Sequence, residues 1–108
     1  MSYRIVPCAE RELDAILLYI AEDNPRAADD LEDRFFALFE RIGNMPGMGH
    51  IREDLTKRED VRFFTLRGYL IAYRTEVEPV EIIHIVSGAM NLLPQIFEVA
   101  PLARSSSS

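Results

Sequence analysis

Cysteine and tryptophan are the residue types that this sequence of 108 residues uses least, with one cysteine and no tryptophan. Cys8 alone cannot form an internal disulfide, and we interpret its thiol as buried and inert. No Cys/His cluster has zinc-site spacing, and no apolar run approaches the ~20 residues of a membrane span. The N-terminus lacks the basic start and apolar core of a secretion signal. These absences predict a cytosolic protein without a metal, a cofactor or a membrane partner.

Basic charge is also scarce, because 12 Lys and Arg residues stand against 18 Asp and Glu residues, a formal net charge of −6. An acidic chain is poorly suited to bind a phosphate backbone unaided. We therefore expect no direct sequence-specific nucleic-acid binding by the chain itself. Residues 51–74 are the exception, with six basic residues against four acidic ones. This excess leaves a local binding patch open, although scattered solvated charge is the simpler interpretation.

The length of the chain is that of one domain, which can bury a modest core without disulfides. We assign residues 1–100 to this domain. Residues 101–108 end in four serines and predict a disordered tail.

Residues 61–86 predict a three-stranded antiparallel meander. Three runs are rich in β-branched and aromatic residues: 61–66, 69–75 and 80–86. Arg67 and Gly68 separate the first two runs, and the glycine accommodates the positive φ of a tight hairpin turn. Both faces of residues 80–86 are largely apolar, so we expect this strand to be central. Residues 3–6 predict a further short strand that joins the meander.

Two histidines are the first candidates for chemistry. Strict alternation along the last strand places Ile83 and Ile85 on one face, opposite Ile82 and His84. We interpret His84 as a hydrogen-bonded residue of the sheet. His50 has the better functional claim because it lies in a loop, but no nucleophile or metal partner stands at a recognisable spacing. The residues by themselves therefore indicate no catalytic set.

Two helices are predicted in the first half of the chain. Residues 9–22 and 25–42 carry apolar residues at helical spacing. Between them, Asn24 suits a helix N-cap and Pro25 the first helical position. So short a break predicts an antiparallel helical hairpin that covers the sheet. Residues 45–60 are rich in glycine, proline and charge, and this long loop either has a function or packs loosely over the sheet edge.

Residues 91–97 predict a last short helix, so the order of elements is β-α-α-β-β-β(-α). The fold class is α+β, with the helical hairpin packed on a small and mostly antiparallel sheet.

These elements carry motifs that resemble the ParE/RelE toxin superfamily, in its ParE-like branch. The first helix ends in YIAEDNP, and the second begins with an alanine-rich segment. The loop contains P-x-x-G-x-x-R-x-D-L, formed by Pro46, Gly49, Arg52, Asp54 and Leu55. The segments GYLIAYR at 68–74 and EIIHIVSGAMN at 81–91 complete a similarity that extends from residue 3 to residue 97. The order and spacing of the motifs, rather than any single one, make the resemblance specific.

The resemblance implies the toxin of a type II toxin–antitoxin pair, held inactive by a small cognate antitoxin of the ParD-like kind. ParE-like members inhibit DNA gyrase, whereas RelE-like members cut messenger RNA at the ribosome. The RelE-like members place Arg, Lys, Tyr or His on the last strands and the C-terminal segment for that chemistry. Here no lysine or arginine follows Arg74 until Arg104, and no tyrosine follows Tyr73. We therefore favour gyrase inhibition, which requires no catalytic residue.

Two alternatives stay open. One is a RelE-like, ribosome-dependent endoribonuclease. The other is a degenerate toxin that acts only as a binding module, because Met90 stands where the family's G-x-R-D turn commonly has arginine.

The antitoxin is expected to bind the helical hairpin. Phe35, Phe36 and Phe39 lie within little more than one helical turn, and we expect that they cannot all point inward. A groove beside them would take an amphipathic helix or an extended segment of the antitoxin.

The gyrase-facing surface is expected to combine apolar anchors with a basic rim. Leu93, Ile96 and Phe97 are the predicted anchors, because buried apolar residues carry most of the affinity of an interface. Arg62 and Arg74 are the predicted rim residues, because rim charges mainly tune the rate of encounter.

Overall fold

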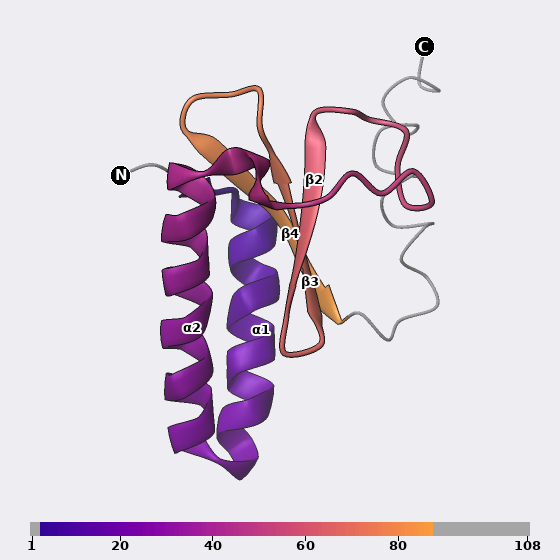
Figure 1. The fold of residues 1–108 in the computed structure, drawn as a ribbon. Helices are drawn as coiled ribbons and strands as arrows, with labels where there is room; N and C mark the ends of the chain where they lie inside the picture. The colour runs from indigo at the N-terminus through magenta and orange to yellow at the C-terminus, as the bar shows by residue number, and fades with distance from the viewer. Residues whose placement is uncertain (1–2, 88–108) are drawn as a thin grey trace.

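A computed structural model describes residues 3–87 of the chain. They form an α+β fold in which two helices lie against a four-stranded sheet (Figure 1). The elements are β1 (Tyr3–Ile5), α1 (Pro7–Asp23), α2 (Pro25–Asn44), the 3₁₀ helix η1 (Pro46–Met48), β2 (Val61–Leu66), β3 (Tyr69–Arg74) and β4 (Val80–Ser87). The predicted fold class is confirmed. The helix predicted at 91–97 and the predicted tail lie outside the described residues.

The sheet has the strand order β1-β4-β3-β2. β1 runs parallel to β4, and the other two strand pairs are antiparallel. β4 therefore lies between two strands, as its two apolar faces predict. Arg67 and Gly68 have φ values of 54° and 84°. They form the two-residue turn predicted between β2 and β3, because positive φ at both positions matches the twist of a hairpin.

β4 does not alternate strictly between the faces of the sheet. Its pairing with β3 shifts in register next to Tyr73, which lies opposite Ile82. Ile82 and Ile85 both join the core beneath the helices, whereas Ile83 packs on the other face. The expectation that Ile83 and Ile85 share a face is therefore wrong, because a bulge adds a residue and reverses the alternation beyond it.

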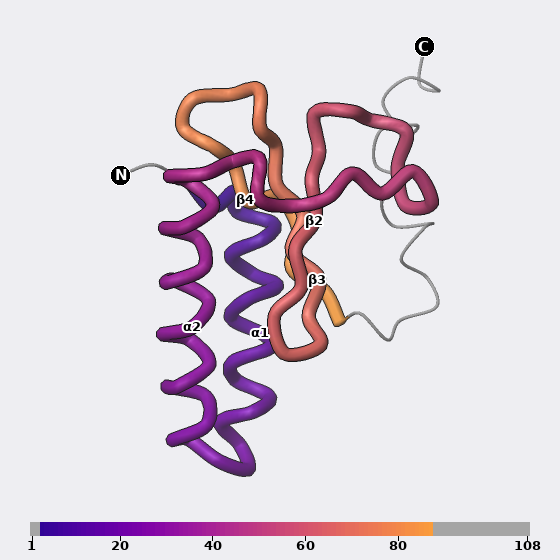
Figure 2. The backbone as a smooth tube through the Cα atoms, in the orientation of Figure 1, coloured from indigo at the N-terminus to yellow at the C-terminus, as the bar shows by residue number. Residues whose placement is uncertain are grey.

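Asn24 separates the two helices and caps the second. Its side chain accepts a hydrogen bond from the Ala27 N–H at 3.1 Å, and Pro25 follows in the first turn of α2, as predicted. α1 begins at Pro7, earlier than predicted. Proline is tolerated in the first turn of a helix, because the N–H that it lacks would have no acceptor within the helix. The helices pack side by side as an antiparallel hairpin (Figure 2). Neither helix has the length and apolarity to span a membrane within the described residues.

Each face of the sheet contributes to a core. The larger core lies beneath the helices and includes Phe35, Phe39, Ile42, Ile71, Tyr73 and Ile82. The smaller core lies on the opposite face and consists of Leu55, Val61, Phe63, Leu70, Ala72 and Val86. Leu55 and Thr56, both from the loop at 45–60, are 2% and 4% exposed. This part of the loop thus packs closely on the sheet.

Candidate functional site

An open groove lies along the helical hairpin, with a volume of about 410 Å³. It is lined by Asp14, Leu17, Leu18 and Ala21 of α1 and by Ala28, Asp29 and Glu32 of α2. Leu18 is 68% exposed, and its neighbour Tyr19 is 77% exposed. Two large and highly exposed side chains beside an open groove make this part of α1 a candidate surface for a partner.

The groove is lined by small residues and by acidic residues. Ala21 and Ala28 face the groove from different helices, and their short side chains fill little of the space between them. Asp14, Asp29 and Glu32 place three carboxylates beside the apolar side chains. The arrangement suits a segment with an apolar face and flanking basic residues, because opposite charges steer association and fix register.

The phenylalanines predicted to contact the antitoxin lie elsewhere. Phe35 and Phe39 are fully buried, with ring centroids 5.9 Å apart. Phe36 is half-buried and packs edge-on against Phe39 at 5.8 Å. Phe35 and Phe39 are therefore core residues in this structure, and only Phe36 stays a candidate contact.

The exposed apolar residues of the hairpin belong to α1 instead. Its segment at 16–20 reads ILLYI, five consecutive apolar residues. Five in a row span more than one stripe of a helix, so some must face away from the core. This run was visible in the sequence, and it marks α1 as a second candidate surface of the hairpin beside the predicted phenylalanines of α2.

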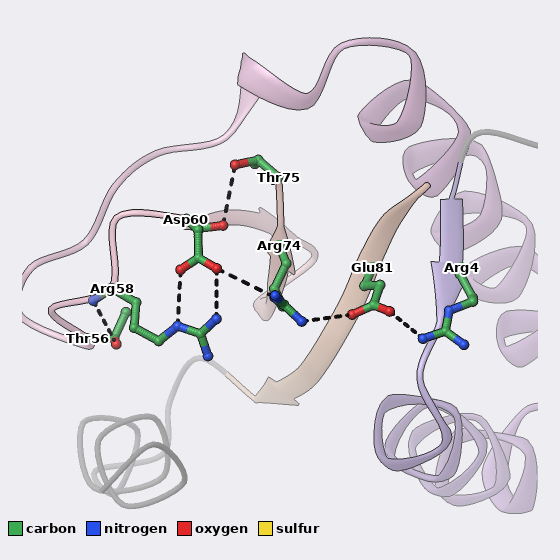
Figure 3. Close-up of polar contacts among 7 residues, drawn as sticks. All are labelled: Arg4, Thr56, Arg58, Asp60, Arg74, Thr75 and Glu81. Carbon is green, nitrogen blue, oxygen red and sulfur yellow. Dashed lines mark hydrogen bonds and ion pairs between the residues drawn. The ribbon is translucent and has the colours of Figure 1, made fainter. Parts of the chain in front are cut away.

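The basic residues predicted to face the target are paired within the chain. Arg74 Nε lies 3.5 Å from Asp60 Oδ2, an ion pair without a hydrogen bond, and its Nη1 lies 3.3 Å from Glu81 Oε1. Figure 3 shows the ion pairs continuing on both sides, with Arg58 bound to Asp60 and Arg4 to Glu81. This series of alternating charges, from Arg58 to Arg4, runs from the loop before β2 across β3 and β4 to β1.

Asp60 is the most tightly held carboxylate of this series. Arg58 donates two hydrogen bonds to it, at 3.0 and 2.7 Å. These bonds, with the nearby charges of Arg58 and Arg74, hold the pKa of Asp60 below its ordinary value. The backbone carbonyl of Asp60 also accepts the Thr75 N–H at 2.9 Å. Partly exposed ion pairs contribute only about 0.2–1 kcal/mol each, so the main effect of the series is to order and neutralise its arginines.

Arg62, the second predicted rim residue, fixes the loop at 45–60. Its Nη1 donates to the Gly49 carbonyl at 3.0 Å. Arg62 and Arg74 are both half-buried, so part of each residue stays accessible to solvent. The structure thus places both arginines on neighbouring strands but does not leave them unpaired. Leu93, Ile96 and Phe97 lie outside the described residues, and their role stays a prediction.

The two histidines and the cysteine differ in their surroundings. His84 Nδ1 lies 3.2 Å from Glu12 Oε2, in agreement with its interpretation as a hydrogen-bonded residue of the sheet. His50 is exposed, and its backbone exchanges two 2.8 Å hydrogen bonds with Phe63 of β2. Cys8, in the first turn of α1, is exposed rather than buried, so that expectation is wrong.

The molecule is thus a small α+β domain in which a helical hairpin with an apolar groove packs on a mixed four-stranded sheet. Residues 3–92 match the family described as "ParE toxin of type II toxin-antitoxin system, parDE". The chain therefore belongs to the ParE toxin family.

Individual relatives agree with this assignment. The chain is 31% identical to "Toxin ParE3" of Caulobacter vibrioides over 86 residues, which cover 79% of this chain and 84% of that protein. Its fold is similar to a solved structure described as "Chromosomal ParDE TA system from P. aeruginosa", with a TM-score of 0.66 and 20% identity. That similarity covers 81% of this chain and 95% of the other. The resemblance seen in the sequence motifs is confirmed.

Proposed function

We propose that this ParE-family toxin acts in the cytoplasm by inhibiting DNA gyrase, and that a cognate, ParD-like antitoxin neutralises it. Membership of the ParE family is the observation that carries this proposal, because gyrase inhibition is the activity associated with the ParE-like branch. The solved structure with a similar fold is described as a ParDE system, which supports an antitoxin partner.

The groove of the helical hairpin is the proposed antitoxin site. Leu17 and Leu18 offer the apolar contact, and Tyr19, the next residue of α1, is also exposed. Tyrosine and other aromatic residues are enriched among the residues that contribute most to binding. The proposed antitoxin segment is an amphipathic helix or an extended strand with basic residues opposite Asp29 and Glu32.

The paired arginines support gyrase inhibition over RNA cleavage. Cutting a phosphodiester requires cations that face the developing phosphorane charge, beside a group that moves the 2′-hydroxyl proton. In this chain Arg74 is engaged by Asp60 and Glu81, and Arg62 by the Gly49 carbonyl. An inhibitor of gyrase needs only a complementary surface, for which we propose the anchors Leu93, Ile96 and Phe97 with Arg62 and Arg74 at the rim.

Purified toxin tests the proposal in two parallel assays. With gyrase and relaxed plasmid, we expect loss of supercoiling and accumulation of cleaved DNA, both reversed by the antitoxin encoded beside the toxin. In a ribosome-based translation reaction, we expect full-length messenger RNA. Cleaved messenger RNA with unimpaired gyrase would replace the proposal by ribonuclease activity. If the protein neither inhibits gyrase nor promotes cleavage of messenger RNA but still binds the antitoxin, it is a degenerate toxin that acts only as a binding module.

A further inference from the structure

Three side chains that are far apart in the sequence meet where α1 packs on β4. Cys8 and Glu12 come from the start of α1, and His84 comes from β4. One ligand atom of each residue lies within 4.8 Å of the other two. Thiolate, imidazole and carboxylate are the ligands that zinc prefers in proteins. Among the described residues, this is the one group of His, Cys, Asp and Glu side chains with such an arrangement.

Local structure orients these three residues. Cys8 and Glu12 are four residues apart in α1 and therefore lie on the same side of the helix. Glu12 Oε1 accepts the Ile85 N–H at 2.8 Å, while its Oε2 lies 3.2 Å from His84 Nδ1. The carboxylate is thus held by the main chain of β4. Metal-binding carboxylates typically have this kind of supporting hydrogen bond.

The distances and charges also suit a zinc ion. Ligand bonds of about 2.0–2.3 Å in a tetrahedral arrangement place the ligand atoms roughly 3.3–3.8 Å from one another. The 3.2 Å separation of His84 and Glu12 is already close to this range. A change of the Cys8 side chain to another staggered rotamer would close the remaining gap. One thiolate and one carboxylate balance the charge of a divalent ion.

We propose that Cys8, Glu12 and His84 form a binding site for Zn²⁺ or a similar divalent transition metal, with water as the fourth ligand. Binding releases the thiol proton to solvent and joins the first turns of α1 to the centre of the sheet. The site is separate from the antitoxin groove and does not depend on gyrase inhibition.

Cobalt(II) is a direct probe of this site. The chelator-treated, full-length toxin is titrated with Co²⁺, and we expect one equivalent to give a thiolate-to-cobalt charge-transfer band and the visible bands of tetrahedral cobalt. Zn²⁺ should displace the cobalt. It should also raise the melting temperature by about 4 °C or more at saturation, because it binds the folded state.

Three variants complete the test. Cys8→Ser should lose the charge-transfer band, and His84→Gln should weaken binding at least about tenfold. His50→Gln changes the other of the two histidines and should behave as wild type. Circular dichroism checks that each variant is folded, and Cys8→Ser at an exposed position is the decisive one if His84→Gln unfolds. The site is refuted if wild type shows no thiolate band, if Cys8→Ser retains it, or if folded His84→Gln binds as tightly as wild type.

Discussion

The hydroxyl of Tyr73 accepts a hydrogen bond from the backbone N–H of Gly49 at 2.8 Å. The same hydroxyl donates to the Pro46 carbonyl at 2.7 Å. Tyr73 is fully buried, and this burial raises the pKa of its hydroxyl. One side chain of the sheet thus satisfies two backbone groups of the loop at 45–60. The conformation of that loop is set from the core, and this explains why a segment rich in glycine and charge is well packed.

Gly49→Ala should destabilise the toxin by about 1–3 kcal/mol. A Cβ at this position would lie 2.4 Å from the Tyr73 hydroxyl and 2.8 Å from the Phe63 carbonyl oxygen, and neither group can move freely. Gly47→Ala is the matched control, because nothing lies within 4 Å of a Cβ there. Urea unfolding of both variants measures the difference. Equal stability of the two would show that the contact between Gly49 and Tyr73 is not as close as the structure has it.

Leu18→Ala should weaken antitoxin binding at least about tenfold while leaving the free energy of unfolding nearly unchanged. The side chain is 68% exposed in the free toxin and would be buried only by the partner. Ile51→Ala, at another exposed apolar residue outside the groove, is the control. Calorimetric titration with the antitoxin measures the effect. Wild-type affinity in Leu18→Ala would place the antitoxin elsewhere.

Phe35→Ala should instead unfold much of the protein, with a loss of about 3–5 kcal/mol. The ring is fully buried between α2 and the sheet, so its removal leaves a cavity. Thermal and urea denaturation without antitoxin measure this loss. A stable Phe35→Ala variant with weakened antitoxin binding would restore the original prediction for this residue.

Asp60→Asn should reduce the loss of stability at acid pH. The pKa of Asp60 is lower in the folded protein, so its ion pairs stabilise the fold above the unfolded value of about 3.9. That contribution, of the order of 1 kcal/mol or less, is lost as pH falls through the folded pKa. Urea midpoints between pH 7 and pH 3 should therefore fall less in Asp60→Asn than in wild type. The same slope in both proteins would assign the acid sensitivity to other carboxylates.

Alanine at both Leu93 and Phe97 should abolish gyrase inhibition while antitoxin binding persists, because apolar anchors carry most of the affinity of an interface. Glutamate at both Arg62 and Arg74 should have a smaller effect that is greatest at low salt. Supercoiling assays across salt concentrations, with antitoxin binding as the check on folding, compare the two double variants. If both double variants remain fully toxic, the proposed gyrase-facing surface is wrong.

Local interactions explain what could be predicted from the sequence. The Asn24 cap bonds a residue three positions away, and the turn at Arg67 and Gly68 requires only positive φ at adjacent residues. Such features depend on neighbours in the chain, so their residue types indicate them directly. The bounds predicted for β2 are the observed ones, and those for β1, β3 and β4 each differ by one residue at the C-terminal end.

Long-range packing explains which features could not be predicted from the sequence. The bulge beside Ile82 depends on how β4 fits between β3 and the helices, and no residue type marks it in advance. His84 and Glu12 are 72 positions apart, and they meet only because α1 docks on β4. The rotation of α2 against the sheet also determines that Phe36 is partly exposed whereas Phe35 is buried.

The contact between Glu12 and Ile85 has a consequence for the toxin before it meets its antitoxin. β1 ends at Ile5, and the Val6 N–H still donates to the Ile82 carbonyl at 3.1 Å. Farther along this side of β4, the Ile85 N–H donates to a helix side chain. Unpaired N–H and C=O groups along the edge of a sheet can pair with another copy of the chain and lead to aggregation. A carboxylate that accepts one of these N–H groups makes it unavailable for such pairing. Within the described residues, Glu12 thus occupies a β4 amide that the three-residue β1 does not reach, at a place where a second copy of the chain would otherwise be able to pair.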